Sequence, residues 1–168
     1  IMFGTPVPIA GSINLGVLKH DHVNIIVHGH DPLLSEMVVA AAQQPDLIDR
    51  ARAAGARGIN LAGMCCTASE ILLRHGIPVA GNFLQQELAI ITGAVDAMVI
   101  DVQCEMQSLQ QVASCFHTRL ITTSPKAKIR GALHIALDEQ NPKAAAQAIV
   151  GEAIAAYRHR KAPLTIPE

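Results

Sequence analysis

The chain has 168 residues, of which 50% are hydrophobic, 16% are charged and 2% are aromatic, and its formal net charge is −1. This aliphatic content excludes a disordered chain, and the near-neutral charge provides no basic face for nucleic acid. No apolar run approaches the roughly 20 residues that a membrane span requires. The length fits one domain with a real core. An average soluble domain has roughly 25% charged residues, so we expect other protein to cover part of this surface.

The start of the chain and its cysteines indicate a cytoplasmic protein. The first residues carry neither a positively charged segment nor a small-residue cleavage site, so nothing in them points to export. Cys65, Cys66, Cys104 and Cys115 do not form a disulfide framework, because two of them are adjacent and vicinal disulfides are strained. Reduced thiols are therefore expected. The chain begins at Ile1 rather than at a methionine, and we expect it to be a piece of a longer protein.

Short aliphatic runs alternate with helical patterns along the chain. The expected strands are residues 23–27, 58–62, 97–101 and 120–123, with a weaker candidate at 134–136. The expected helices are residues 34–53 (divided at Pro45), 68–75 (ending at Gly76), 84–92 (ending at Gly93), 107–115 and 142–160. Thr67 and Glu70 have the spacing of a capping box at the start of the second of these helices.

This alternation predicts an α/β protein with a three-layer Rossmann-like fold, in which a mostly parallel sheet of about five or six strands has helices on both faces. Residues 1–20, rich in proline and glycine, are expected to form an N-terminal connector. Residues 21–160 would form the Rossmann-like domain. Residues 161–168 would be a tail that leads into a following domain.

Three successive strands place metal-binding side chains at one edge of this sheet. His28 and His30 follow the first strand, Cys65 and Cys66 the second, and Cys104 the third. Ligands of open α/β sheets bind beyond the carboxyl ends of the strands. Imidazole with two thiolates suits zinc, copper or an iron–sulfur centre. Zinc fits less well, since the short C-x₂₋₄-C knuckle of structural sites is missing, and adjacent cysteines do not easily bind one metal together.

Ordinary roles are expected for the other candidates. Cys115 lies inside a helical pattern and is interpreted as a core residue rather than a ligand. The remaining histidines that we considered lie in helix ends or loops and are given no function: His75, His117, His134 and His159. No G-x-G-x-x-G follows a strand, so dinucleotide binding is not supported.

Longer motifs resemble a known enzyme family. HGHDPLLSE at residues 28–36 and GINLAGMCCT at residues 58–67 resemble the catalytic subunit of the anaerobic, nickel-containing carbon monoxide dehydrogenases. The resemblance covers essentially the whole chain. The other matching segments are residues 3–6, 74–78, 81–87, 92–98, 101–104 and 121–123.

The resemblance implies a cofactor and its ligands. In that family the subunit is longer, with a helical N-terminal region and two Rossmann-like domains, of which this chain resembles the middle one. A nickel–iron–sulfur cluster of the Ni–4Fe–4S type is held by one histidine and five cysteines, and three of these ligands map onto His30, Cys66 and Cys104. His30 and Cys66 would hold the exposed iron and Cys104 an iron of the cubane part. Cys65 would lie beside the site and affect the cluster through packing or hydrogen bonding.

The resemblance also implies an activity and partners. The parent enzyme would oxidise CO with water to CO₂, releasing two protons and two electrons to a ferredoxin-like carrier, as a cytoplasmic homodimer. The remaining ligands and the additional 4Fe–4S clusters belong to other parts of that protein. We therefore expect this chain to be inactive alone. We also expect His30, Cys66 and Cys104 to cluster at an open, exposed edge of the sheet.

Two alternatives stay open. A hybrid-cluster protein, which reduces hydroxylamine or nitrogen oxides, has the same architecture but a glutamate at the position of the exposed-iron cysteine. Here that position is Cys66 and the nearest glutamate is Glu70, which favours the dehydrogenase. The other alternative is a non-catalytic Rossmann-like binding module, which would have no reason to keep a His/Cys/Cys set.

Overall fold

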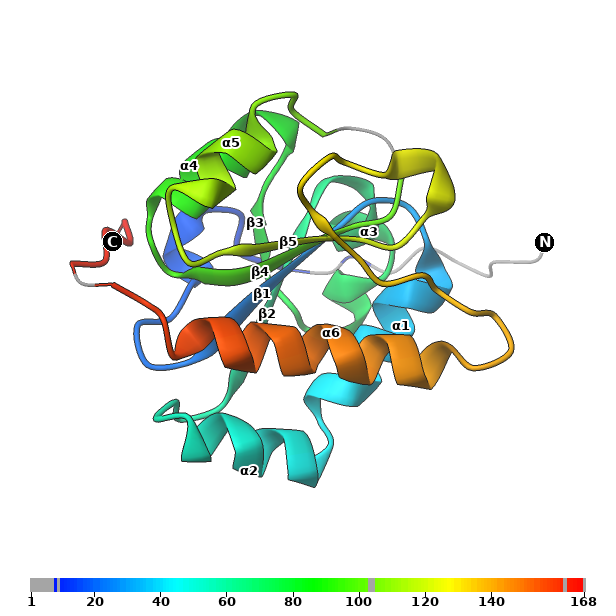
Figure 1. Ribbon diagram of the computed structural model, residues 1–168, viewed down its shortest axis with the longest axis horizontal. Helices are drawn as coiled ribbons and strands as arrows, with labels where there is room; N and C mark the ends of the chain where they lie inside the picture. Colours follow the sequence, from blue (N-terminus) through cyan, green and yellow to red (C-terminus); the bar gives the residue numbers. More distant parts are fainter. Residues whose placement is uncertain (1–7, 9, 103–104, 162, 168) are drawn as a thin grey trace.

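The computed structural model describes residue 8 and residues 10–102, 105–161 and 163–167. Its centre is a six-stranded sheet in the order β3-β2-β1-β4-β5-β6 (Figure 1). Every pair of neighbouring strands is parallel. The strands are β1 (Val23–His28), β2 (Ile59–Met64), β3 (Val79–Gly81), β4 (Val95–Ile100), β5 (Arg119–Thr122) and β6 (Leu133–His134). This is the doubly wound order. Starting from β1, the chain adds β2 and β3 on one side of the sheet and then β4, β5 and β6 on the other side.

Helices cover both faces of the sheet, with α4 and α5 above it and α1, α2 and α6 below it in the view of Figure 1. The helices are α1 (Pro32–Ala42), α2 (Pro45–Ala53), α3 (Cys65–Glu70), α4 (Gln86–Ile91), α5 (Leu109–Ser114) and α6 (Pro142–Tyr157). Short 3₁₀ turns lie at Leu15–Val17, Leu72–His75, Phe83–Gln85 and Pro125–Ala127. The predicted three-layer α/β fold is therefore confirmed.

The core has two parts, one on each face of the sheet, because successive side chains of a strand point to opposite sides. In β1, Ile25 belongs to the cluster between the sheet and helices α1 and α6. Ile26 belongs to the cluster between the sheet and helices α4 and α5. Both side chains are fully buried. Strands buried on both faces explain why the sequence shows continuous aliphatic runs rather than alternation.

Several expected helix boundaries are confirmed. Pro45 begins α2 and so separates it from α1. Gly76 and Gly93 both follow helical turns with positive φ, 70° and 71°, where glycine avoids the steric cost of a Cβ. The start of α3 was predicted wrongly. Thr67 lies inside α3 with its hydroxyl against that of Ser35, so it does not cap the helix.

Two further features differ from the sequence-based expectation. β3 was not predicted, because three residues between Pro78 and Asn82 are too short to show a pattern. Cys115 was expected in the core, but it is the C-terminal cap of α5 and its side chain is exposed.

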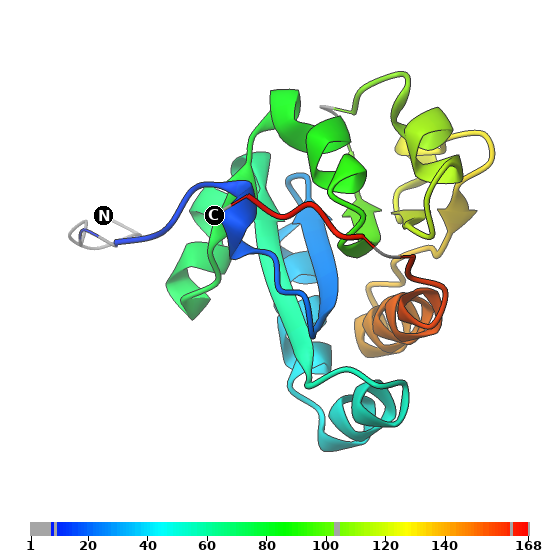
Figure 2. The ribbon, with the colours of Figure 1, turned by 90° about the vertical axis from the view of Figure 1, so that its left-hand side faces the viewer.

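The segments at both ends of the described chain pack against the domain. The backbone carbonyl of Ser12 accepts a hydrogen bond from the Val79 amide at 2.9 Å, and the side chain of Leu18 is buried. The C-terminal segment runs from α6 toward the 3₁₀ turn Leu15–Val17 (Figure 2), and the Thr165 amide donates to the Thr92 carbonyl at 2.8 Å. The domain boundaries at residues 20/21 and 160/161 stay predictions. Among the described residues, no helix has the length and apolar character needed to span a membrane.

A buried ionic network closes the amino end of the sheet. The Asp96 carboxylate is fully buried at the start of β4. It accepts hydrogen bonds from the backbone N–H of Asn24 at 2.7 Å and from His117 Nε2 at 2.9 Å. The Arg160 guanidinium contacts the same carboxylate, and it also donates to the carbonyls of His22 and Ala94, each at 2.9 Å. This network joins β1, β4 and the segment after α6.

We expect Arg160→Met to lower the free energy of unfolding by about 3 kcal/mol, because it leaves a buried carboxylate without its cation. Arg158→Met is the matched control, since Arg158 is exposed two residues earlier, and it should change stability by less than about 0.5 kcal/mol. Chemical denaturation of the two variants measures the difference. Equal stability of both would show that the network does not hold the fold together.

Candidate metal centre

The candidate site lies where β2, β1 and β4 end side by side. His28 at the end of β1 is in register with Met64 of β2 on one side and with Ile100 of β4 on the other. The residues that follow these three positions therefore start from neighbouring points on one edge of the sheet. The carboxyl edge beside a reversal of strand order is where open α/β sheets bind their ligands.

A buried carboxylate holds the loop after β1. Asp101, 2% exposed, accepts a hydrogen bond from the His30 amide at 2.6 Å and further bonds from the amides of Asp31 and Val102. Gly29 makes this approach possible. It has φ 134°, and an added Cβ would lie 1.8 Å from Asp101 Oδ1. Only glycine fits between the two histidines of the HGH motif.

The imidazole of His30 is oriented for ligation. Its Nδ1 lies 3.3 Å from the carbonyl oxygen of Val102, which can only accept, so Nδ1 carries the proton in this contact. Nε2 is then unprotonated and can act as a metal ligand. Histidines that bind metals usually donate their other ring N–H to a carbonyl or carboxylate in this way. His30 is half-buried at the edge of the sheet.

Helix α1 and helix α3 are fastened to each other next to this loop. The Asp31 side chain caps α1 by accepting from the amides of Leu33 and Leu34 at 2.9 and 3.2 Å. The Thr67 amide donates to the Gly29 carbonyl at 2.9 Å, and the Thr67 hydroxyl contacts that of Ser35. The start of α3 is thereby held against the loop that carries His30.

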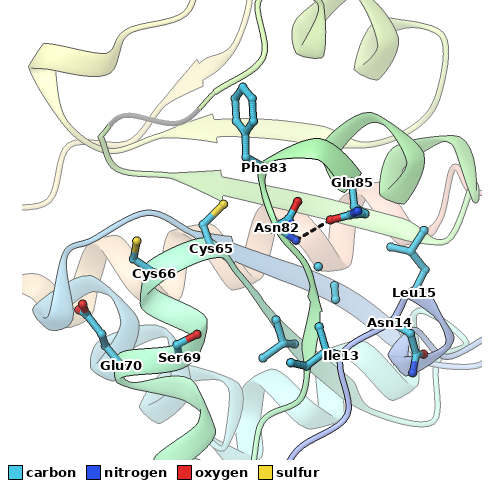
Figure 3. Close-up of a pocket in the computed structure, with 13 residues that line it drawn as sticks. Ile13, Asn14, Leu15, Cys65, Cys66, Ser69, Glu70, Asn82, Phe83 and Gln85 are labelled. Carbon is cyan, nitrogen blue, oxygen red and sulfur yellow. Dashed lines mark hydrogen bonds between the residues drawn. The ribbon is translucent and has the colours of Figure 1, made fainter.

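The vicinal cysteines form the first turn of α3. Cys65 has the left-handed φ of 61°, which is uncommon for a residue with a side chain. It is half-buried, whereas Cys66 is exposed. Figure 3 shows both thiol groups projecting in the same direction from the start of α3. They border a cavity of about 780 Å³ that reaches Asn82 and Phe83 beyond β3.

A buried histidine lies beneath the cysteines. His28 Nε2 is 3.1 Å from Cys65 Sγ and 2.9 Å from Gln86 Nε2. Burial lowers the pKa of His28 to about 4, and the nearby His30 adds to this effect. His28 is therefore a neutral imidazole at pH 7. Within the part of the chain that the structure describes, its Nδ1 has no hydrogen-bond partner.

The sequence-based candidates fall into two groups. His30 and Cys66 lie at the same edge of the sheet, and Cys104 falls outside the described residues, between Val102 and Glu105. The clustering of the three therefore stays a prediction. The described residues alone contain no group of three possible metal ligands. Three of the other four candidate histidines and Cys115 have contacts of their own: His75 pairs with Glu36, His117 with Asp96 and His134 with Thr122, and Cys115 donates weakly to Gln111. The fourth, His159, is exposed.

Asp101 and Gln86 were not predicted from the sequence. Asp101 follows a strand directly, as catalytic and binding carboxylates often do, but it was counted as part of the strand. Gln86 carried no signal, because a glutamine in the first turn of a helix is ordinary. The available donors are an imidazole with a free Nε2 and an exposed thiol, and this set fits a soft metal centre such as iron–sulfur.

The fold is that of a Rossmann-like α/β domain, and comparison with known proteins identifies its family. Residues 1–165 match the Prismane/CO dehydrogenase family, and the chain belongs to this family. The resemblance to carbon monoxide dehydrogenases seen in the sequence motifs is confirmed.

Individual relatives agree. Carbon monoxide dehydrogenase 1 of Methanosarcina acetivorans is 53% identical over 169 residues, which cover 100% of this chain and 27% of the relative. The solved structure of carbon monoxide dehydrogenase IV from Carboxydothermus hydrogenoformans is 57% identical, with a TM-score of 0.90 over 98% of this chain and 26% of that one. A solved acetyl-CoA synthase/carbon monoxide dehydrogenase, described with NiZn[Fe4S4] and NiNi[Fe4S4] clusters in its alpha subunits, is 50% identical with a TM-score of 0.91 over 98% of this chain and 25% of that one. The chain thus spans about a quarter of the length of these relatives.

The pKa of His28 predicts a loss of stability in acid. His28 takes up a proton near pH 6.5 in the unfolded chain but only near pH 4 in the folded chain. The contribution of neutral His28 to the free energy of unfolding is therefore complete above pH 6.5 and falls as the pH is lowered toward 4. Between pH 7 and pH 5 this amounts to about 2 kcal/mol. Denaturation at both pH values should show this loss, and His28→Gln should be less sensitive to pH by that amount. Identical pH dependence of both proteins would mean that His28 is not buried as a neutral group.

Proposed function

We propose that this chain is the middle Rossmann-like domain of the catalytic subunit of an anaerobic, nickel-containing carbon monoxide dehydrogenase, an oxidoreductase that converts CO and water to CO₂, two protons and two electrons. The observation that carries the proposal is the pair of donors at one sheet edge, the half-buried His30 and the exposed Cys66. Family membership and relatives named as carbon monoxide dehydrogenases support it. The chain alone would be inactive.

In this proposal His30, Cys66 and Cys104 hold part of a Ni–4Fe–4S cluster, and the other ligands and further 4Fe–4S clusters come from outside this chain. The bound cluster supplies Lewis-acidic metal that activates water and carries electrons. The chain's own residues set the ligand geometry. The Asp101 carboxylate fixes the backbone of His30 by accepting the His30 backbone amide at 2.6 Å. The Val102 carbonyl orients the imidazole of His30 through its contact with Nδ1.

The vicinal cysteines would have different roles. Cys66 faces solvent at the start of α3 and is accessible to a cluster. Cys65 contacts His28 at 3.1 Å and would influence the cluster by packing or hydrogen bonding instead of binding it. Two adjacent thiolates do not easily bind one metal together, and the contact of Cys65 with His28 supports Cys66 as the ligand.

The proposal includes the partners of the whole enzyme. CO, CO₂ and water are the substrates and products, a ferredoxin-like protein takes the electrons, and the parent subunit works as a cytoplasmic homodimer. Residues 1–20 and 161–168 connect the Rossmann-like domain, residues 21–160, to its neighbours. The hybrid-cluster alternative is disfavoured because Glu70, the nearest glutamate, lies at the far end of α3 from Cys66.

Cysteine variants of the full-length subunit that contains this chain test the proposal. After anaerobic loading, Cys66→Ser should lose most of its cluster iron and nickel, because it removes a thiolate ligand. Cys65→Ser, the matched control one residue away, should retain both metals. Elemental analysis of purified subunits measures the contents. Retention of both metals by Cys66→Ser, or their loss only from Cys65→Ser, would contradict the ligand assignment.

A further inference from the structure

Gln86 is a fully buried amide beneath the candidate metal centre. It is the first residue of α4, a helix that contributes no proposed ligand. Its Oε1 accepts the amide hydrogen of Met106 at 3.0 Å, and its Nε2 lies 2.9 Å from His28 Nε2. One side chain therefore joins β1 to the segment that follows Cys104.

The hydrogen-bonding partners define the orientation of this amide. The Met106 N–H can only donate, so the atom of Gln86 facing it must be the oxygen. Gln86 Nε2 then donates to His28 Nε2, which must be the unprotonated nitrogen of a neutral imidazole. The proton of His28 is therefore on Nδ1.

This tautomer extends the connection to the vicinal cysteines. Cys65 Sγ lies 3.1 Å from the same nitrogen, so the Cys65 thiol and the Gln86 amide share its single lone pair. The contact holds the half-buried Cys65 side chain against His28, and Cys66 follows the left-handed backbone of Cys65 as an exposed residue in the first turn of α3.

The same helix contacts the segment 105–108 a second time. The hydroxyl of Ser108 donates to Glu87 Oε1, one residue after Gln86. Met106 and Ser108 are thus both hydrogen-bonded to the start of α4.

We propose that Gln86 is a positioning residue for the cluster: its amide sets the relative placement of the three ligand-bearing loops through His28, Cys65 and Met106. The inference rests on the proposed function, since it concerns how the same site is held. Gln86 does not touch the metal. Residues that orient metal ligands commonly change metal affinity by about 10- to 100-fold when they are replaced.

Metal retention by the full-length subunit tests this role. Gln86→Met keeps the volume of the side chain and removes the hydrogen bonds to Met106 and His28, and the loaded variant should lose iron and nickel to a chelator about 10-fold more readily than the unmodified subunit. Its electron paramagnetic resonance spectrum should also change, which a loss of stability elsewhere would not cause. Gln147→Met is the matched control. It removes one glutamine hydrogen bond, 2.7 Å to Gln44, between α6 and α2, and should retain metal and spectrum.

Gln86→Glu provides a second variant if Gln86→Met does not fold. A carboxylate still accepts from the Met106 amide but cannot donate to His28, so the connection to Met106 remains. We expect a smaller loss of metal than in Gln86→Met, with an altered spectrum. Wild-type metal retention and spectrum in the folded Gln86 variants, alongside metal loss in Cys66→Ser, would overturn this inference and leave the proposed function standing. Metal retention in Cys66→Ser would instead contradict the proposed function.

Discussion

The parallel, side-by-side arrangement of β2, β1 and β4 is the constraint on which the site depends. Because these strands are neighbours and run in the same direction, the residues that follow them leave the sheet at one edge. His30 and Cys66 come from separate parts of the sequence, and the strand order alone brings their loops together. The loop that holds Cys104 begins at the same edge, after β4.

Two buried carboxylates join β1 to β4 at opposite ends of this pair. At the amino end, Asp96 accepts the Asn24 amide at 2.7 Å, and at the carboxyl end Asp101 accepts the His30 amide at 2.6 Å. The two strands meet where the winding of the sheet reverses, and crossover helices diverge from this point to opposite faces. Charge-assisted hydrogen bonds to backbone amides strengthen the junction at both ends. The stability of the fold and the geometry of the site therefore depend on the same pair of strands.

Much of the fold was predictable from the sequence because its signals are local. Aliphatic runs identified the buried strands β1, β2, β4 and β5, and Gly76 and Gly93 marked the ends of helical turns. The start of α3 was not predictable in this way. Thr67 has the spacing of a cap, but its contact with Ser35 on α1 depends on tertiary packing, and the helix begins at Cys65 instead.

The donors of the candidate site were predictable from strand ends, whereas the residues that hold them were not. His30 and Cys66 are recognisable by residue type. Asp101 acts by accepting backbone amides. Gln86 acts through the Met106 amide and through His28. These contacts depend on tertiary packing, and no sequence pattern predicts them. Cys115 is an error of another kind: a helical pattern that includes it suggested burial, but a short pattern does not show which side of the helix faces the core, and Cys115 is exposed at the end of α5.

Anomalous X-ray diffraction at the iron absorption edge, measured on crystals of the loaded full-length subunit, tests the central claim most directly. The account predicts iron peaks within bonding distance of His30 Nε2, Cys66 Sγ and Cys104 Sγ, with Cys65 Sγ outside that distance and next to His28. Iron bound through Cys65, or an absence of iron at this edge of the sheet, would contradict it.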